Sequence, residues 1–220
     1  LQHIIMMQIV SILARANSGT FRIFHTNHCI LFHHSITKQG RRPYLYFPLA
    51  SERGLKSAIT PDGGGDATIN QTSFLLEPES VENLHNNRGV RNFWVRVRDA
   101  GVFSALGASD MQQARKFTPE EEPVTLSAGF MWHSVRRTVK DYGVESTVTT
   151  FIPWDSNVEI MAVTLRNASD GVKTLTPCAA VPIYGRSADN LRDHRHVTSL
   201  LHRIQVTEEG VLVKPTMSFD

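Results

Sequence analysis

Short stretches of alternating apolar and polar residues are the feature that most limits how this chain can fold. Residues 91–98 place Phe93, Val95 and Val97 opposite Trp94 and its neighbouring arginines. A period of two is typical of a strand that buries one face. No stretch has the spacing of a long amphipathic helix. The pattern therefore predicts an all-β fold, a large antiparallel β-sandwich with few short helices.

Turn residues divide the second half of the chain into three expected hairpins. The predicted pairs are 130–139 with 144–152, 158–166 with 175–181, and 201–206 with 211–214. Short segments rich in Asp, Asn, Ser or Gly separate the members of each pair, as such residues do in tight turns. Two further elements are expected, a short strand at 43–49 and a helical turn at 109–117.

The length and composition of the chain favour a single sandwich domain over residues 43–220. Residues 1–42 differ in character, with a histidine-rich segment and no clear period, and we expect them to be disordered or non-native. The apolar run at 4–14 is interrupted by Gln8 and is too short to span a bilayer. It resembles a signal peptide before Ala14-Arg15-Ala16, but it lacks the basic residues that normally precede one.

Charge and cysteine content exclude several classes of protein. The net charge is +2 and the chain has no long run of Lys or Arg, so no nucleic-acid partner is expected. Cys29 and Cys178 match no metal or redox spacing, which favours a reduced, cytoplasmic protein. No membrane association is expected either.

The polar run at 182–203 contains the strongest candidate binding residues. Its arginines offer planar donors that suit phosphate, carboxylate or sugar hydroxyls, and Asp and Asn supply acceptors. If the chain is extended from Asn190 onward, one face carries Asn190, Arg192, His194, His196 and His202. Such a row can hold a sugar or an anion. Alternatively, the Arg and Asp side chains pair with each other and only fasten a turn, and residue chemistry alone favours this interpretation.

A metal site is a third interpretation of the same run. His194, His196 and His202 with Asp193 include a His-x-His pair that suits zinc on a strand. The four arginines nearby oppose a dication, so no metal is expected.

Weaker candidates lie earlier in the chain. Asn86 and Arg88 belong to an amide-rich loop, and Trp94 stands beside arginines. Trp94 can stack on a sugar face, or it can pack in the core under arginine stems. The strand pattern favours the core position.

Several motifs together resemble the N-terminal β-sandwich, or supersandwich, domain of glycoside hydrolase family 94, formerly glycosyltransferase family 36. The likeness begins at residue 43 and covers about four fifths of the chain. Within the family it is most similar to the 1,2-β-oligoglucan phosphorylases, with the cellobiose phosphorylase group more distant. The motifs are YLYFPLA at 44–50, NLHNNR at 83–88, RNFW at 91–94, AGFMW at 128–132, the run 182–203 and KPTMSFD at 214–220.

This resemblance implies an inverting phosphorolysis of β-linked gluco-oligosaccharides to a sugar 1-phosphate, together with the reverse transfer. Inorganic phosphate is the co-substrate, and no cofactor is implied. A hydrolase needs a second carboxylate to activate water, whereas phosphate is already a nucleophile. In the family the catalytic Asp lies in a helical barrel that follows the sandwich. We therefore assign no catalytic residue here, and we expect this chain to be a fragment that is inactive alone.

The resemblance also implies a homodimer in which a sandwich loop approaches the neighbouring active site. On this basis Arg186, Asn190, Arg192 and His194 are expected to contact the sugar. Other residues of the run and the two weaker segments are expected to shape the site, namely Asp189, Asp193, Arg195, His196, Asn86, Arg88 and Trp94. The alternative function is a carbohydrate-binding or structural sandwich without chemistry.

Overall fold

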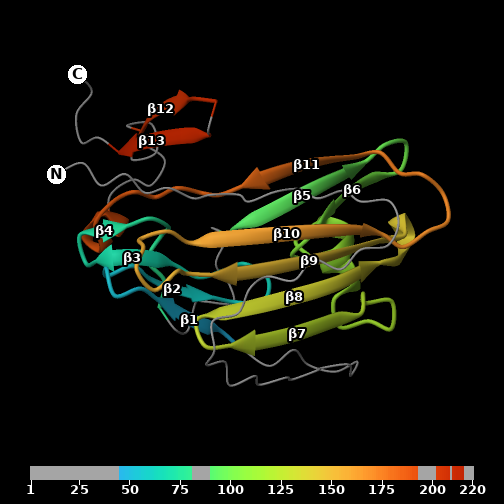
Figure 1. Ribbon diagram of the computed structural model, residues 1–220, viewed down its shortest axis with the longest axis horizontal. Helices are drawn as coiled ribbons and strands as arrows, with labels where there is room; N and C mark the ends of the chain where they lie inside the picture. The colour runs from blue at the N-terminus through green and yellow to red at the C-terminus, as the bar shows by residue number, and fades with distance from the viewer. Residues whose placement is uncertain (1–44, 81–89, 193–201, 209, 216–220) are drawn as a thin grey trace.

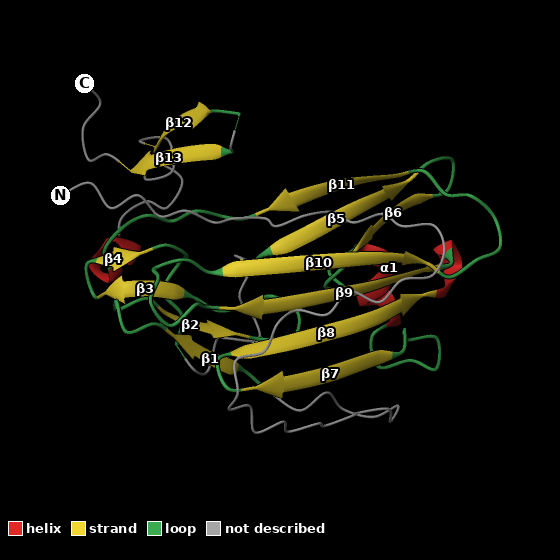
Figure 2. Ribbon diagram, viewed as in Figure 1, coloured by secondary structure: helices red, strands yellow, loops and turns green. Residues whose placement is uncertain are grey.

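The computed structural model describes residues 45–80, 90–192, 202–208 and 210–215, and most of them form antiparallel strands (Figure 1). The all-β sandwich predicted from the sequence is confirmed. Figure 2 shows how little of the described chain is helical. Residues 1–42 and the expected boundary at residue 43 lie outside the described residues.

The largest sheet has the strand order β10-β9-β8-β7 (Figure 1). Its strands are β7 (Val124–Gly129), β8 (Trp132–Val139), β9 (Val144–Phe151) and β10 (Ile160–Asn167). The hairpin predicted over 130–152 is confirmed, because β8 pairs with β9 and Val139 lies opposite Val144. The short helix η1 (Lys140–Tyr142) joins them, and Gly143 ends it at φ +58°, which glycine adopts without steric cost.

A three-stranded sheet packs against this sheet and encloses the main core. It has the order β11-β5-β6 and consists of β5 (Asn92–Val97), β6 (Gly101–Ser104) and β11 (Leu175–Ala180). The alternation in residues 91–98 is confirmed, since Phe93, Val95 and Val97 are buried. They meet apolar residues of β8, β9 and β10 in one cluster, which includes Val139, Val144, Val148, Met161, Val163 and Leu165.

The hairpin predicted between 158–166 and 175–181 is wrong. β10 pairs with β9, whereas β11 pairs with β5, so the chain passes from one sheet to the other between them. Both arrangements reverse the chain at the same turn residues. The observed arrangement buries Val163 and Leu165 from one sheet, and it packs Leu175 and Ala179 from the other against the same core. Burial of apolar area therefore decided the pairing.

A second four-stranded sheet continues from one end of the sandwich. It contains β1 (Phe47–Ala50), β2 (Lys56–Ile59), β3 (Ala67–Asn70) and β4 (Ser73–Phe74) in sequence order. The strand predicted at 43–49 therefore begins later, at Phe47. A buried ion pair fastens this sheet to the sandwich, because Arg91 Nη2 donates to Glu159 Oε2 at 2.9 Å and to Ser57 Oγ at 2.7 Å. Such bonds satisfy charges that would otherwise be costly to bury.

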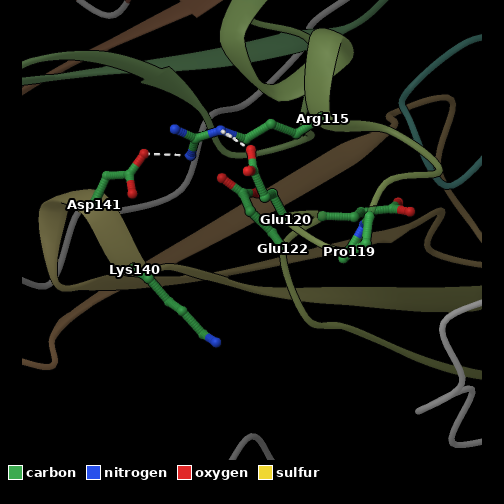
Figure 3. A pocket seen from close by; sticks show the side chains of 7 residues that line it. Arg115, Pro119, Glu120, Glu122, Lys140 and Asp141 are labelled. Carbon is green, nitrogen blue, oxygen red and sulfur yellow. Dashed lines mark hydrogen bonds and ion pairs between the residues drawn. The ribbon is translucent and has the colours of Figure 1, made fainter.

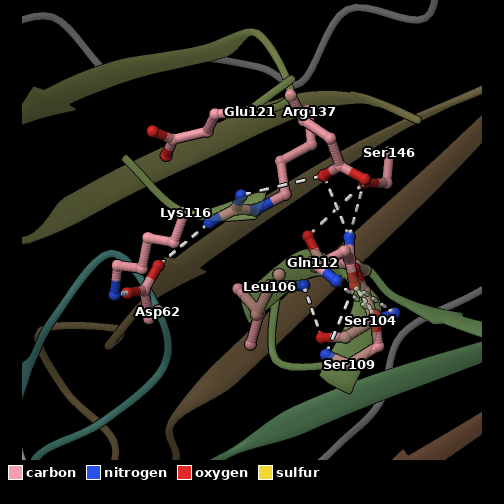
Figure 4. Close-up of polar contacts among 12 residues, drawn as sticks. Asp62, Ser104, Leu106, Ser109, Gln112, Lys116, Glu121, Arg137 and Ser146 are labelled. Carbon is pink, nitrogen blue, oxygen red and sulfur yellow. Dashed lines mark hydrogen bonds and ion pairs between the residues drawn. The ribbon is translucent and has the colours of Figure 1, made fainter. Parts of the chain in front are cut away.

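The helix α1 (Asp110–Arg115) confirms the helical turn predicted at 109–117. Ser109 and Gln112 form a capping box at its start, and the Gln112 amide also donates to the Glu122 carboxylate at 2.9 Å. Next to this helix, the buried Arg137 donates to Asp62 Oδ1 at 2.9 Å (Figure 4). The polar cluster thus joins α1, β8 and the loop between β2 and β3.

The last described element is a two-stranded ribbon of β12 (His202–Val206) and β13 (Val211–Pro215) at the edge of the molecule (Figure 1). This confirms the third predicted hairpin. Across the described ranges, none of the helices has the length and apolar content that a membrane crossing requires.

Candidate functional site

The described part of the polar run, residues 182–192, is held against the edge of the β1–β4 sheet. Phe74 and Arg186 form an antiparallel bridge, with Phe74 N donating to Arg186 O at 2.8 Å and Arg186 N to Phe74 O at 3.1 Å. Tyr184 N donates to Leu75 O at 2.8 Å. Ile183 packs beside Leu75 and Leu76 in a small apolar cluster. The loop is therefore tied to the sheet on both sides of Gly185.

The extended conformation considered from Asn190 onward is not found at residues 190–192, and residues 193–201 lie outside the described residues. Residues Ala188–Arg192 form the short helix η2. Ser187 explains the change, because its Oγ accepts from Asp189 N at 3.2 Å and its carbonyl accepts from Asn190 N at 3.1 Å. A serine that bonds the backbone two residues later starts a turn in competition with a strand. Asn190 and Arg192 consequently do not share a strand face.

Arg186 and His202 form the electrostatic centre of this loop. Arg186 is only 5% exposed, and His202 at the start of β12 is half-buried. Burial lowers the pKa of His202, the charge of Arg186 lowers it further, and a bond to Tyr184 acts in the opposite direction. His202 Nε2 lies 3.0 Å from Tyr184 O. Since a carbonyl can only accept, Nε2 carries the proton and Nδ1 is the acceptor of the neutral ring.

Gly185 brings the β12–β13 ribbon close to the loop. Its φ is +66°, and a Cβ there would lie 2.4 Å from Pro215 Cγ. Only glycine fits both the backbone conformation and this close approach. The contact places the base of the ribbon, at His202 and Pro215, against the turn that precedes Arg186.

The predicted site residues are distributed unevenly in the structure. Arg186, Asp189 and Asn190 lie together in the loop, with Arg186 buried, Asp189 exposed and Asn190 half-buried. The backbone of Arg192 ends η2. The remaining predictions in the run and in the amide-rich loop lie outside the described residues, namely Asp193, His194, Arg195, His196, Asn86 and Arg88.

Trp94 lies on a different sheet from this loop. It is opposite Cys178 and Ser104 in the β11-β5-β6 sheet, and it is half-buried. Phe93 and Val95 on either side face the core, so Trp94 projects from the outer face of the sheet. The core position favoured for it is therefore wrong.

Two residues of the site, Tyr184 and Gly185, were not among the predicted site residues, whereas His202 was considered only as a member of an extended row with Asn190 and Arg192 and of the histidine metal site. Gly185 carried a usable signal, because a glycine next to a buried apolar segment often marks a tight turn or a close backbone approach. The hydrogen bond between His202 and Tyr184 joins residues that are 18 positions apart, and no local sequence pattern predicts it.

A polar cavity of about 340 Å³ lies elsewhere, beside the end of α1 (Figure 3). None of the predicted site residues lines it. Arg115 pairs with Asp141 and lies 3.9 Å from Glu120, and the Lys140 side chain extends away from this group. The lining residues are Arg115, Pro119, Glu120, Glu121, Glu122, Lys140 and Asp141. This mostly charged lining differs from the apolar lining of typical ligand pockets.

The side chains of the loop at 182–192 are better suited to ligand binding than to catalysis. A buried guanidinium lies near an imidazole acceptor, and an amide and an exposed carboxylate follow within four residues. These groups suit hydroxyl-bearing or anionic ligands. In the ranges that the structure describes, no group of three or more His, Cys, Asp or Glu is placed to hold a metal ion. The histidine cluster considered from the sequence lies mostly beyond those ranges.

Comparison with protein-family models matches residues 49–216 to the supersandwich domain of glycosyl hydrolase 94. The match covers more than half of the chain and includes the loop at 182–192 and both strands of the ribbon. No curated protein matches the chain.

Proposed function

Because this chain belongs to glycoside hydrolase family 94 through its supersandwich domain, we propose that it is part of an inverting glycoside phosphorylase. The proposed reaction breaks a β-glucosidic bond with inorganic phosphate and forms an α-sugar 1-phosphate, and it also runs in reverse. The family match, which spans the polar run, is the observation that carries this proposal. The proposed substrates are β-1,2-linked gluco-oligosaccharides, on the basis of the motif resemblance.

The chemistry needs one carboxylic acid to protonate the leaving oxygen, while phosphate supplies the nucleophile. We place that acid in a catalytic domain that works together with the sandwich, and none of the residues described here is assigned the role. In this proposal, the sandwich supplies residues that bind the sugar. Arg186, Asn190, Arg192 and His194 are proposed to contact the sugar, and Asp189 and Asp193 to orient the arginines.

The anchoring of the loop supports this role. Two backbone bonds to Phe74, one to Leu75 and the contact of Gly185 with Pro215 hold the segment that leads to Arg192. A recognition group on a held backbone loses less entropy when a ligand binds. A homodimer is proposed as the assembly in which this loop approaches a neighbouring active site. A cytoplasmic location is proposed because Cys29 and Cys178 match no metal or redox spacing.

The test is phosphate release by the full-length protein from α-glucose 1-phosphate and β-1,2-gluco-oligosaccharides. Arg192→Ala is expected to raise the KM for the oligosaccharide by about tenfold, the effect of losing a hydrogen bond from a charged donor. The melting temperature should stay unchanged. Arg166→Ala removes an exposed arginine of β10 and is the matched control.

Two outcomes would contradict the proposal. If no β-glucoside supports phosphate release by the wild-type protein, the phosphorylase assignment is wrong. If Arg192→Ala lowers the melting temperature and leaves the turnover of the folded protein unchanged, the arginine only fastens the turn.

A further inference from the structure

The outer face of the β10-β9-β8-β7 sheet carries an apolar row at one end. The strand register places Gly129, Trp132, Phe151 and Ile160 side by side across all four strands. The next residue of β8, His133, is buried in the opposite face, so Trp132 projects outward. Trp132 and Phe151 are both half-buried and lie opposite each other on the neighbouring strands β8 and β9.

Trp132 rests on the sheet because its neighbour is a glycine. A Cβ at Gly129 would lie 2.4 Å from Trp132 Nε1 and 2.7 Å from Cε2, so any larger residue would displace the indole. The indole therefore covers Gly129 instead of standing away from the backbone. Its Nε1 is buried and has no hydrogen-bond partner, and this edge of the indole faces Gly129.

Three hydroxyl groups and one alanine methyl group form the next row of the same face. Ser127, Ser134, Thr149 and Ala162 lie side by side across the strands, and Thr149 Oγ1 donates to Ser134 Oγ at 3.0 Å. The first charged side chain on this face is Arg136, one row further from the turn. The two rows nearest the β7–β8 turn are therefore uncharged.

Two more aromatic residues lie at this end of the sheet. Phe130, in the β7–β8 turn, is 73% exposed, and Trp154, three residues after Phe151, is 68% exposed. Met131 fixes the turn, since its φ is +58° and its Sδ accepts from Ala50 N at 3.1 Å. A non-glycine residue at positive φ is uncommon, and here the surrounding contacts hold it.

We propose that these two rows form a binding platform for a saccharide chain. Trp132 and Phe151 supply flat apolar surfaces for the C–H face of a pyranose ring, and Ser127, Ser134 and Thr149 supply donors and acceptors for its hydroxyls. A neutral, hydroxyl-bearing ligand matches a face that is neutral and hydroxyl-bearing. An anionic ligand would find no cation in these rows, and an apolar protein surface would leave the hydroxyl row without partners.

The identity of the saccharide rests on the proposed function, which names β-linked gluco-oligosaccharides. Binding to the platform requires neither phosphate nor turnover. A direct binding measurement therefore separates this proposal from the phosphorylase assignment, and either can fail without the other.

The test is titration of the full-length protein with β-1,2-gluco-oligosaccharides in the absence of phosphate, followed by calorimetry and by tryptophan fluorescence. Binding at any other saccharide site persists in all variants and is fitted separately. Trp132→Ala and Phe151→Ala are each expected to weaken platform binding by about tenfold, as losses of stacked aromatic groups commonly do. Phe117→Ala removes an exposed aromatic residue at the end of α1 and should leave the affinity unchanged.

Thr149→Val tests the platform without removing an aromatic residue, and it guards against an alanine variant that fails to fold. It keeps the side-chain shape and removes one hydroxyl, so a saccharide should bind more weakly. A protein-docking face would become more apolar and bind its partner more strongly. Unchanged saccharide affinity in Trp132→Ala, Phe151→Ala and Thr149→Val would overturn the proposal. A wild-type dimer in sedimentation velocity that Trp132→Ala dissociates would also overturn it.

Discussion

At the scale of single residues, His133 is a titratable side chain that is buried in the core of the described chain. It is 2% exposed, and Phe47 stacks on its ring with centroids 4.6 Å apart. Burial lowers its pKa to about 4, and the nearby charge of Arg91 acts in the same direction. The imidazole is therefore neutral in the folded protein at neutral pH.

This lowered pKa predicts acid sensitivity. Between pH 6.5 and about 4 the unfolded state binds a proton at His133 and the folded state does not, so stability falls as the pH falls. The full difference corresponds to about 3 kcal/mol at most. Urea denaturation of the wild type and of His133→Gln at pH 7, 5.5 and 4 measures it. The raised pKa of Asp66 acts in the opposite direction in both proteins, so the difference between them isolates His133. Equal pH slopes would contradict the prediction.

Residue chemistry indicated part of the candidate site. It correctly selected the segment around Arg186, because several side chains with specific polar groups occur together there. It did not anticipate that Arg186 is buried, or that Ser187 turns the backbone into a short helix. Both depend on contacts with Phe74 and with Gln71, whose carbonyl accepts from Ala188 N, and these residues are more than 100 positions away. The roles proposed for the site residues stay predictions.

At the scale of elements, the turn between β6 and α1 depends on a close approach. Gly107 has φ +82°, and a Cβ there would lie 2.5 Å from Cζ of the buried Arg137. The same guanidinium binds Asp62 (Figure 4). The absence of a side chain at Gly107 thus lets one arginine connect the turn, β8 and the β2–β3 loop.

Gly107→Ala is expected to destabilise the fold by at least about 2 kcal/mol, because it adds both backbone strain and a collision with a buried charged group. Gly171→Ala is the matched control, since nothing lies within 4 Å of its Cβ position and the chain there is exposed. Urea midpoints of the two variants give the comparison. A Gly107→Ala variant as stable as Gly171→Ala would show that Arg137 moves aside freely.

The elements themselves were largely predictable, and their partners were less so. The β8–β9 and β12–β13 hairpins follow from a short connection with a glycine at positive φ. The segment 168–174 offered similar turn chemistry but joins two different sheets. Turn residues show where a chain reverses, whereas the strand partner depends on which apolar faces can be buried together.

At the scale of the whole molecule, the β12–β13 ribbon presents an apolar face that the rest of the described chain leaves open. Its register aligns Ile204 with Val213 and Val206 with Val211, and the three residues Ile204, Val206 and Val211 are exposed. The charged Arg203 and Lys214 lie together on the opposite face. An isolated two-stranded ribbon is marginally stable, so such a face favours association.

We expect the chain to self-associate at micromolar concentration through this ribbon, and the double variant Ile204→Thr, Val206→Thr to remain monomeric. Threonine keeps the β-branched shape and removes apolar surface. Val172→Thr alters an apolar residue in an exposed loop and should leave the association unchanged. Sedimentation velocity across a range of concentrations measures each outcome. A monomeric wild-type chain would contradict this expectation.

The pairing of β5 with β11 also affects folding of the chain during its synthesis on the ribosome. Trp94 pairs with Cys178, which is 178 − 94 = 84 residues later. At ribosomal speeds of about 5 to 20 residues per second, roughly 4 to 17 s separate the synthesis of these two strands. During that interval the edge of β5 that later receives β11 has no partner, and the core cannot close. The growing chain therefore depends on protection at this edge, and chaperone binding is expected to be strongest before residue 180 leaves the ribosome.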